Sequence, residues 1–402
     1  MPHATARVDL SAISENLERL RARAPQSSVM AVIKANGYGH GAVEVARTAR
    51  ETGVAWLGFA HPAEALQVRA AGDTGRMLAW LWVPGDPDVA AALAADVDLS
   101  VNSPAALAEI VRAAEGLGHR PRVHLKVDTG LSRNGCPMSD WDALVQAAHR
   151  SPVEVVAVWT HLANADAATV AGPSVSDQVA TLHAAVAAAR GGGLEVPIVH
   201  CANTAGVIAH PQSHLDLVRL GIGMYGLRSV GRSEEPAIAT APAGAGAPLA
   251  APLLRPAMSL ESSIALTKTL PAGTAVGYGS TWVADRVTRV GLVPVGYADG
   301  LPRSASGRAD VLVADVRAPI VGRIAMDQCV VDLSNAPGTG VGSRVVVFGD
   351  GRGGEPTADD LADAAGTIGY DVVTGIGSRV ARVVVDGQPR AHSAPSRVRQ
   401  DG

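Results

Sequence analysis

The sequence predicts an α/β fold in two parts: an N-terminal (β/α)8 barrel of the TIM type over residues 1–245 and a mostly β domain over residues 246–402. From residue 28 to about residue 220, short apolar runs alternate with alanine-rich amphipathic segments. Beyond residue 256 the helical repeat disappears. At 402 residues the chain is also too long for one ordinary core, which favours a barrel with an added domain.

The first part contains eight strand-like runs separated by helical patterns. Parallel strands need crossover connections, so this alternation indicates a parallel sheet. Eight repeats in about 200 residues fit a closed barrel better than an open sheet. The predicted strands are Ser28–Ile33, Ala55–Phe59, Met77–Trp82, Val97–Val101, Arg122–Val127, Val153–Trp159, Pro197–His200 and Leu215–Leu220. The predicted helices include Ala42–Thr52, Ala63–Ala71, Pro104–Gly116 and Asp177–Arg190.

An open, doubly wound sheet is the structural alternative. The sequence Gly221-Ile-Gly-Met-Tyr-Gly226 matches the GxGxxG pattern of dinucleotide-binding folds. The pattern falls at the end of the alternation, however, and no acidic residue follows about twenty positions later. We interpret it as a loop that binds phosphate through backbone N–H groups after the last barrel strand.

The second part is predicted to contain strands separated by Gly/Pro turns. It follows a linker-like segment, Leu227–Pro256, which is nearly low-complexity over Ala239–Pro252. One helix is predicted at Ala358–Gly366, with Thr357 as its N-cap. The predicted strands are Leu260–Thr269, Arg289–Pro294, Asp310–Ala314, Val330–Leu333 and Arg344–Phe348.

Composition and charge argue against several classes of function. The net charge is -4 and no dense Lys/Arg cluster occurs, so we expect no nucleic-acid partner. The three cysteines, Cys136, Cys201 and Cys329, show no CxxC spacing, which disfavours a disulfide framework and a structural zinc site. No secretory signal and no bilayer-spanning run is visible. We therefore expect a soluble, cytoplasmic protein with no membrane partner.

The stretch Val29–Gly41 carries the strongest functional signal. An apolar run ends at Lys34, and three glycines lie within five residues, at positions 37, 39 and 41. A lysine at a strand mouth, above a loop that can approach a ligand closely, suits an amine that forms a Schiff base with a carbonyl cofactor. A single lysine of this kind is more often a solvated strand end, so the interpretation depends on the rest of the chain.

Polar and aromatic residues gather at the predicted C-terminal ends of five barrel strands, where barrel active sites form. Their mixture of Lys, Arg, His and Tyr favours an anionic ligand with a ring and a phosphate. With few carboxylates among them, no metal site is expected. These residues are Lys34, Tyr38, Lys126, Asp128, Arg133, His161, His200, Asn203, Thr204 and Arg219.

Five motifs occur in order along the chain. They are Lys34-Ala-Asn-Gly-Tyr-Gly-His-Gly41, His200-Cys-Ala-Asn203, Arg219-Leu-Gly-Ile-Gly-Met-Tyr-Gly226, Gly296-Tyr-Ala-Asp-Gly300 and Gly322-Arg-Ile-Ala-Met-Asp-Gln328. With these motifs the chain resembles the bacterial alanine racemases of fold-type III, from about Arg7 to Val385. The resemblance implies pyridoxal 5'-phosphate as cofactor and alanine as substrate.

The resemblance also implies a reaction with two bases. Racemisation removes the α-proton from one face and returns a proton on the other, so two groups must flank the planar carbon. By the resemblance, Lys34 binds the cofactor and acts on the D-isomer, whereas Tyr278 acts on the L-isomer. His161 and Arg219 are the expected support for Tyr278. Arg219 would also face the cofactor's ring nitrogen and, because it stays protonated, make the ring a weaker electron sink.

Other cofactor contacts follow from the same resemblance. Arg133 is expected to contact the cofactor's phenolic oxygen and the substrate carboxylate. Lys126 matches a lysine that is often carbamylated in the family to position this arginine, and an unmodified Lys126 is the alternative. Thr204 stands where serine is common but keeps the hydroxyl. The remaining expected cofactor-binding residues are Tyr38, Asn203, Gly221, Ile222 and Tyr370.

The β domain is expected to complete the site from a partner subunit. By the resemblance, Met326 and Asp327 form the loop that binds the substrate carboxylate, and Tyr297 with Tyr370 narrows the substrate channel toward a methyl side chain. Tyr278 and this loop would reach the other chain of a head-to-tail homodimer. The leading hypothesis is thus an alanine racemase that supplies D-alanine for peptidoglycan. A racemase of broader specificity and a cofactor-binding barrel without turnover are the alternatives.

Overall fold

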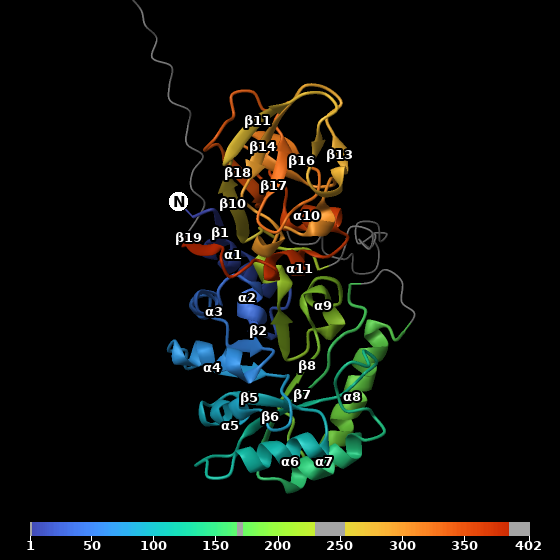
Figure 1. Cartoon of the computed structure of the whole chain (residues 1–402). Helices are drawn as coiled ribbons and strands as arrows, with labels where there is room; N and C mark the ends of the chain where they lie inside the picture. Colours follow the sequence, from blue (N-terminus) through green and yellow to red (C-terminus); the bar gives the residue numbers. More distant parts are fainter. Residues whose placement is uncertain (1, 167–171, 230–253, 386–402) are drawn as a thin grey trace, which may run out of the picture.

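The structure, a computed structural model, describes residues 2–166, 172–229 and 254–385. The α/β domain lies below the β domain in Figure 1, with α10 and α11 between the two sheets. Within the described ranges, no helix has the length and apolar character needed to cross a membrane.

Eight parallel strands form the predicted barrel, arranged in sequence order around the sheet. The last strand, β9, pairs with the first, β2, which closes the sheet. Backbone hydrogen bonds from Asp216 to Val199 (3.2 Å) and from Arg219 to Ala202 (3.0 Å) hold the seam between β8 and β9. The barrel prediction is confirmed, because an open doubly wound sheet would keep its end strands apart. The strands are β2 (Ser28–Val32), β3 (Trp56–Phe59), β4 (Arg76–Ala79), β5 (Asp98–Val101), β6 (Arg122–Lys126), β7 (Glu154–Trp159), β8 (Ile198–His200) and β9 (Leu217–Leu220).

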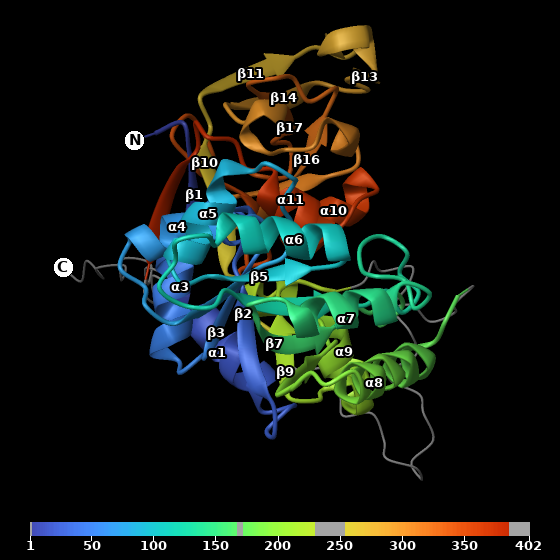
Figure 2. The same ribbon diagram turned by 90° about the horizontal axis from the view of Figure 1, so that it is seen from below.

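Helices α3 to α8 lie outside the strands, as Figure 2 shows. Pro62, Pro87 and Pro104 each occupy a first turn, where the missing N–H of proline costs nothing. Ser174 caps α8 by accepting the N–H of Asp177 at 3.1 Å. The helices are α1 (Leu10–Arg21), α2 (Lys34–Tyr38), α3 (Ala42–Glu51), α4 (Pro62–Ala70), α5 (Pro87–Ala94), α6 (Pro104–Ala113), α7 (Trp141–Arg150), α8 (Val175–Gly191) and α9 (Thr204–Ala209).

The second domain is built on a nine-stranded sheet in the order β11-β14-β17-β16-β15-β18-β10-β1-β19. Its strands are β1 (Ala4–Asp9), β10 (Met258–Ser263), β11 (Leu266–Leu270), β14 (Thr288–Val293), β15 (Asp310–Val313), β16 (Val316–Val321), β17 (Cys329–Asp332), β18 (Arg344–Phe348) and β19 (Ala381–Val385). A separate hairpin joins β12 (Ala275–Val276) and β13 (Trp282–Val283).

The strands predicted for this domain need several corrections, and the β12–β13 hairpin was not predicted. The single strand predicted at Leu260–Thr269 is two strands, because Ile264 and Ala265 lie outside any strand and separate β10 from β11. Sequence analysis missed β16, in which Pro319 interrupts the strand signal. It also missed β19, which pairs in parallel with β1.

The domain division expected at residues 245 and 246, and the linker-like Ala239–Pro252, lie outside the described residues. One strand from the expected barrel half belongs to the other sheet. β1 pairs with β10 in antiparallel register, for example Ala6 with Leu260. The N-terminus therefore begins in the β domain before the chain enters the barrel.

Two helices connect the β domain to the barrel mouth. α10 (Ala358–Ala365) begins at the predicted cap, where the Thr357 hydroxyl accepts the N–H of Asp360 at 3.1 Å. Sequence analysis missed the short α11 (Gly369–Thr374), which lies against α2. A Cβ on Gly39 would lie 2.2 Å from the carbonyl oxygen of Val373, so only glycine allows this approach. This packing places α11 over the barrel mouth.

Candidate active site

A cavity of about 950 Å³ opens at the C-terminal ends of the barrel strands and is bounded on one side by α11. It gathers most of the site residues predicted in the barrel, together with Tyr370 from the β domain. Asp128 and His200 do not line it; the Asp128 carboxylate accepts the N–H groups of its own loop instead. The predicted residues that line the cavity are Lys34, Tyr38, Lys126, Arg133, His161, Asn203, Thr204, Arg219, Gly221, Ile222 and Tyr370.

Lys34 follows β2 and begins a tight left-handed turn. The backbone φ angles of residues 35–38 lie between 51° and 62°. For Ala35 this conformation costs roughly 1–2 kcal/mol, and such strain persists only where surrounding contacts impose it. The Asn36 side chain accepts the N–H of the first residue of α3 at 2.9 Å, and Glu64 accepts the N–H of Ala35 at 2.6 Å. The turn holds Lys34 Nζ 5.6 Å from the centre of the Tyr38 ring.

The cavity is strongly cationic. Burial and the charge of Arg133 lower the pKa of Lys34; Glu64 opposes this shift, and Arg219 adds to it. Burial, followed by the charges of Arg219 and Arg133, lowers the pKa of Lys126 to about 7. Because the neutral amine is the nucleophilic form, both lysines are suited to react with carbonyl carbon.

Arg219 is buried, and four hydrogen bonds hold its guanidinium. Nη1 donates to Nδ1 of His200 at 3.0 Å, and Nη2 donates to Nδ1 of His161 at 3.1 Å. Nη2 also donates to the carbonyl oxygens of Thr160 (3.2 Å) and Cys201 (3.0 Å), so one of its two N–H groups serves two acceptors. Burial lowers the pKa of Arg219 to about 10, which leaves it charged near neutral pH. Within the described chain Nε has no partner, so this N–H is available to a ligand.

His161 is neutral in this environment. Burial, followed by the charges of Arg219, Lys126, Arg133 and Lys34, lowers its pKa well below the usual range. Its Nδ1 accepts from Arg219, so its proton resides on Nε2. His161 can therefore donate one hydrogen bond into the cavity.

Hydroxyl groups and a glycine loop form another part of the cavity. The Tyr38 ring lies 6.1 Å from that of Tyr370, and burial raises the pKa of both phenols, so both are neutral donors. A Cβ on Gly221 would lie 2.8 Å from the Tyr38 hydroxyl, which explains the need for glycine there. The Thr204 hydroxyl accepts the N–H of Gly221 at 3.1 Å and keeps its own proton for a ligand. Asn203 caps α9 by accepting the N–H of Gly206 at 2.9 Å.

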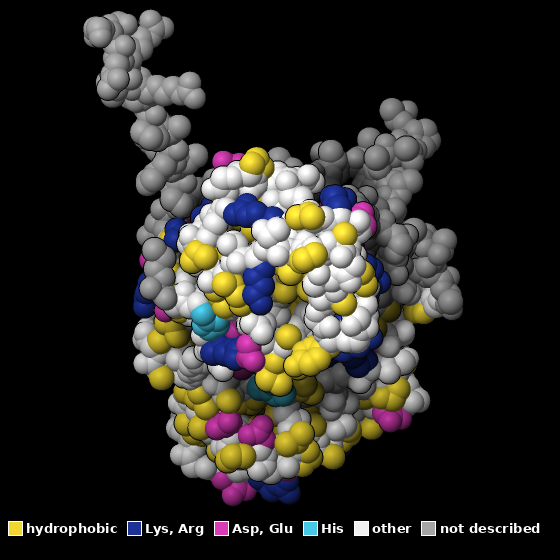
Figure 3. Space-filling view, turned by 45° about the horizontal axis from the view of Figure 1, so that its top comes forward, with side chains coloured by type: hydrophobic (Ala, Val, Ile, Leu, Met, Phe, Trp, Pro, Cys, Tyr) yellow, Lys and Arg dark blue, Asp and Glu magenta, His cyan; other side chains and the backbone are white. Residues whose placement is uncertain are grey.

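The other predicted residues of the β domain, Tyr278, Tyr297, Met326 and Asp327, do not line this cavity. Tyr278 is 74% exposed, Met326 53% and Tyr297 41%. Asp327 forms an ion pair with Arg379 at 2.7 Å. The loops of Tyr297 and Met326 are neighbours, because the N–H of Tyr297 donates to Ala325 at 3.1 Å. Figure 3, which looks toward this end of the molecule, shows hydrophobic side chains spread over the surface. One chain alone therefore does not bring Tyr278 to Lys34.

Sequence reasoning missed several residues that line the cavity. Trp159 is the most informative: Lys126 Nζ lies 4.5 Å and the Arg219 guanidinium 4.9 Å from its ring centre. Its indole N–H donates to the Ser100 hydroxyl at 3.0 Å. A tryptophan that ends a strand beside predicted cations is a signal that could have identified it. The others include Trp80, Asn102, Asn134 and Asp166.

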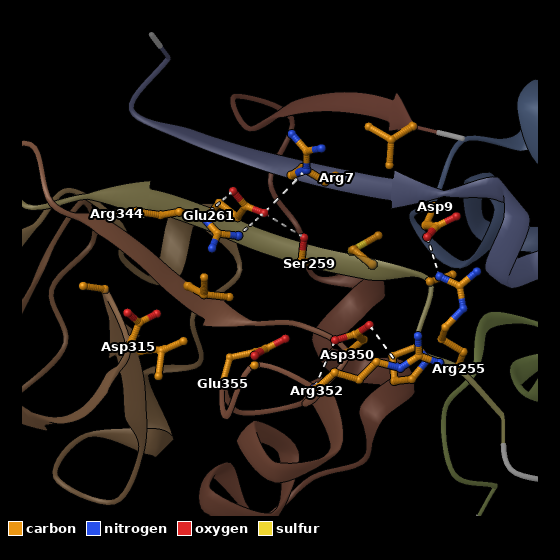
Figure 4. A pocket seen from close by; sticks show the side chains of 18 residues that line it. Arg7, Asp9, Arg255, Ser259, Glu261, Asp315, Arg344, Asp350, Arg352 and Glu355 are labelled. Carbon is orange, nitrogen blue, oxygen red and sulfur yellow. Dashed lines mark hydrogen bonds and ion pairs between the residues drawn. The ribbon is translucent and has the colours of Figure 1, made fainter. Parts of the chain in front are cut away.

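A second cavity, of about 650 Å³, lies in the β domain beside β1, β10 and β18. Figure 4 shows arginines and carboxylates facing one another across it. Arg255 pairs with Asp9, and Arg344 pairs with Glu261 at 3.0 Å. Because Arg255 and Arg344 are already paired with carboxylates, the barrel cavity is the better candidate for catalysis.

The three cysteines do not line the cavity. Cys136, Cys201 and Cys329 are free and buried. Burial raises the pKa of Cys201 to about 12, so its thiol is a poor nucleophile. Among the residues that the structure describes, no group of three or more His, Cys, Asp and Glu is placed to hold a metal ion.

Comparison with known proteins agrees with this geometry. The family model for the alanine racemase N-terminal domain matches residues 8–229, and that for the C-terminal domain matches residues 257–384. The alanine racemase of Streptomyces coelicolor is 46% identical over 393 residues, which cover 95% of this chain and 96% of the relative. That of Beutenbergia cavernae is 44% identical over 389 residues, 96% of this chain and 98% of the relative.

Solved structures give the same result. The crystal structure of the alanine racemase from D-cycloserine-producing Streptomyces lavendulae has a TM-score of 0.87 and 46% identity, and covers 96% of this chain and 97% of that chain. The Streptomyces coelicolor structure has a TM-score of 0.86 at 44% identity, with 96% and 98% of the two chains covered. The barrel, the β domain, the cationic cavity and these full-length matches lead to one conclusion: the chain belongs to the alanine racemase family.

Proposed function

We propose that this protein interconverts L-alanine and D-alanine with pyridoxal phosphate, the cofactor of its family. The observation that carries the proposal is the single cavity that holds Lys34, Arg219 and the hydroxyls of Tyr38 and Thr204. An amine of lowered pKa, a cationic donor and hydroxyl donors are what an aldehyde, a ring nitrogen and a phosphate require. When bound, the cofactor supplies the electron sink that acidifies the α-carbon of an amino acid.

The residues present fit the cofactor. The lowered pKa of Lys34 favours the free amine that would bind the aldehyde. Arg219 Nε is the donor that would face the ring nitrogen, and Arg133 would face the phenolic oxygen. Thr204, Tyr38 and Tyr370 would bind the phosphate, as would the N–H of Ile222. The N–H of Gly221 would join them only by sharing its present bond to Thr204.

The proposed proton transfers use one base from each of two chains. Lys34 would take and return the α-proton on the face of the D-isomer, and Tyr278 would do so on the face of the L-isomer. Tyr278 is exposed on its own chain, as are Met326 and Tyr297. Their exposure supports a head-to-tail homodimer in which this surface covers the barrel cavity of the partner. His161 and Arg219 would then support Tyr278.

We further propose that Lys126 is carbamylated. Its pKa of about 7 leaves much of the amine neutral, and only the neutral amine adds to carbon dioxide. The carbamate would place an anion among Arg133, Arg219 and Lys34, which offsets their mutual repulsion. It would also orient Arg133 toward the substrate carboxylate. An unmodified Lys126 would leave these cations without that partner.

Substrate size would be set near the tyrosines. Tyr370 lines the cavity, and Tyr297 would approach from the partner together with the Met326–Asp327 loop. Two phenol rings at the entrance favour a methyl side chain over longer ones. We propose a cytoplasmic enzyme that supplies D-alanine for peptidoglycan. We also propose that the barrel domain spans residues 1–245 and the β domain residues 246–402, except that strand β1 belongs to the sheet of the β domain.

The test is D-alanine formed from pure L-alanine by the purified protein with pyridoxal phosphate, alongside L-serine and L-lysine. Selective conversion of alanine supports the proposal. Comparable conversion of serine or lysine would assign the chain to racemases of broader specificity. No conversion, with cofactor still bound through Lys34, would favour a cofactor-binding barrel without turnover.

A further inference from the structure

A column of polar side chains crosses the interior of the barrel below Arg219. Nε2 of His200 lies 3.2 Å from Nδ1 of His124, and Nε2 of His124 lies 3.1 Å from a carboxylate oxygen of Asp98. Asp98, His124 and His200 are each 0% exposed. Asp98 begins β5 and His200 ends β8, so the column runs from the far end of the barrel toward its mouth. Barrel interiors are usually filled by branched apolar residues, and buried polar groups are costly.

The protons of this column have only one arrangement. A guanidinium N–H can only donate, so Nδ1 of His200 must accept from Arg219. His200 therefore carries its proton on Nε2 and donates to Nδ1 of His124. His124 in turn carries its proton on Nε2 and donates to Asp98. Both rings are then neutral, in agreement with burial, which lowers the pKa of each.

Asp98 is fixed as a carboxylate at the far end. Arg76 donates to it at 2.6 Å and Arg122 at 2.7 Å. Burial alone would raise the pKa of Asp98, but the hydrogen bond from His124 and the charges of Arg76 and Arg122 leave it below the usual value. A carboxylate only accepts hydrogen bonds, so Asp98 determines which nitrogen of His124 is protonated.

The histidine nearest the site is also fixed in orientation. The Trp159 ring stacks on His200 with centroids 5.2 Å apart and an interplanar angle of 6°. Arg219 lies over the same tryptophan at 4.9 Å. His200 can therefore neither tilt nor exchange its two nitrogens without disturbing Trp159 and Arg219.

We propose that Asp98, His124 and His200 are positioning residues that orient the Arg219 guanidinium and polarise it through a one-way chain of hydrogen bonds. Buried hydrogen bonds in series strengthen one another, and carboxylate–histidine pairs orient reacting groups in this way at other sites. The effect on the cofactor rests on the proposed function, in which Arg219 meets the ring nitrogen. The proton arrangement does not depend on it.

The first test needs neither cofactor nor activity. Two-bond ¹H–¹⁵N correlation spectra of the apoprotein report which nitrogen of each of the 12 histidines is protonated. His124→Gln and His200→Gln variants assign the two signals. Both rings should be neutral with the proton on Nε2 near neutral pH. A proton on Nδ1 of either ring, or a charged ring, would overturn the proposal.

The second test compares Asp98→Asn with Asp73→Asn. Asp73 is a matched control because its carboxylate also meets two arginines, Arg50 at 2.8 Å and Arg69 at 3.7 Å, but outside the column. With ring-¹⁵N pyridoxal phosphate bound, Asp98→Asn should shift the ring nitrogen resonance and lower racemisation by about 10- to 100-fold. Asp73→Asn should change neither. Equal behaviour of the two variants would refute the proposal.

Failure of the proposed function gives a different result. If wild-type holoenzyme binds pyridoxal phosphate without racemising alanine, the proposed function fails. The ring nitrogen resonance of Asp98→Asn compared with Asp73→Asn, together with the histidine spectra, still decides whether the column acts on Arg219. If Asp98→Asn does not fold, the wild-type histidine spectra alone decide the proton arrangement.

Discussion

The barrel mouth and the exposed face of the β domain carry the two halves of one proposed site. The two halves differ in how far their side chains are buried and held by hydrogen bonds. At the mouth, Arg219 is only 4% exposed and its guanidinium is held before any ligand arrives. On the β domain, Tyr278 is 74% exposed. The mouth is thus organised by its own chain, whereas in the proposed dimer the β-domain half would be covered only by the partner. Cofactor binding and turnover should therefore be separable by mutation.

The largest effect is expected at the mouth. Lys34→Ala should abolish the absorbance of bound pyridoxal phosphate and lower racemisation by about 10³-fold, since both the covalent anchor and one base are lost. Lys268→Ala, in exposed strand β11, is the control and should retain both. Spectra and D-alanine assays measure the two outcomes. A Lys34→Ala protein with normal turnover would contradict the assignment.

Tyr278→Phe tests the other half. Removing one hydroxyl from an exposed side chain should leave cofactor absorbance and melting temperature unchanged, yet lower turnover of L-alanine by roughly 10²-fold or more. Val283→Ala, on the neighbouring exposed hairpin, should leave turnover intact. Unchanged initial rates from L-alanine in Tyr278→Phe would exclude this tyrosine as a base.

A moderate effect on stability is expected from Lys126. Its pKa is about 7 when folded but 10.5 for a free lysine, so between these values the unfolded chain binds more protons and stability rises with pH. Without bicarbonate, Lys126→Met should melt higher than wild type near pH 7, and the gap should narrow toward pH 10. Added bicarbonate should also narrow it. Melting temperatures of both proteins across this pH range are the measurement. A difference in melting temperature that does not change with pH would show that burying the Lys126 amine does not destabilise the fold.

The smallest effect concerns the strained turn after Lys34. Ala35 is exposed and has φ 53°, so Ala35→Gly should relieve strain and raise stability by up to about 1 kcal/mol. Ala42→Gly, at the regular start of α3, should instead destabilise by about 1 kcal/mol. Chemical denaturation distinguishes the two. Destabilisation by Ala35→Gly would mean that the turn is not strained.

The sequence predicted the barrel and its mouth because both follow from local patterns. Each strand is an apolar run beside a helical repeat, and the C-terminal ends of the strands collect Lys34, Lys126, His161 and Arg219 in one place. The closing of β9 on β2 then brings the first and last of these ends together.

Long-range pairing could not be predicted in the same way. β1 is six residues long and gives no local sign that its partners lie near residues 258–262 and 381–385. Asp98 and His124 look like ordinary strand residues, and only the barrel register brings them into line with His200. The separation of Tyr278 from Lys34 likewise depends on how the two domains are placed, and the sequence motifs carry no information about that placement.

The most direct test of the shared site is complementation between two inactive variants, Lys34→Ala and Tyr278→Phe. If each site takes its bases from two chains, mixed dimers contain one intact site, and random exchange should restore about one quarter of wild-type activity, since half of the dimers are mixed and one of their two sites is complete. Recovery of this size after exchange is the predicted result. No recovery, with mixed dimers shown to form, would mean that Lys34 and Tyr278 do not meet across subunits.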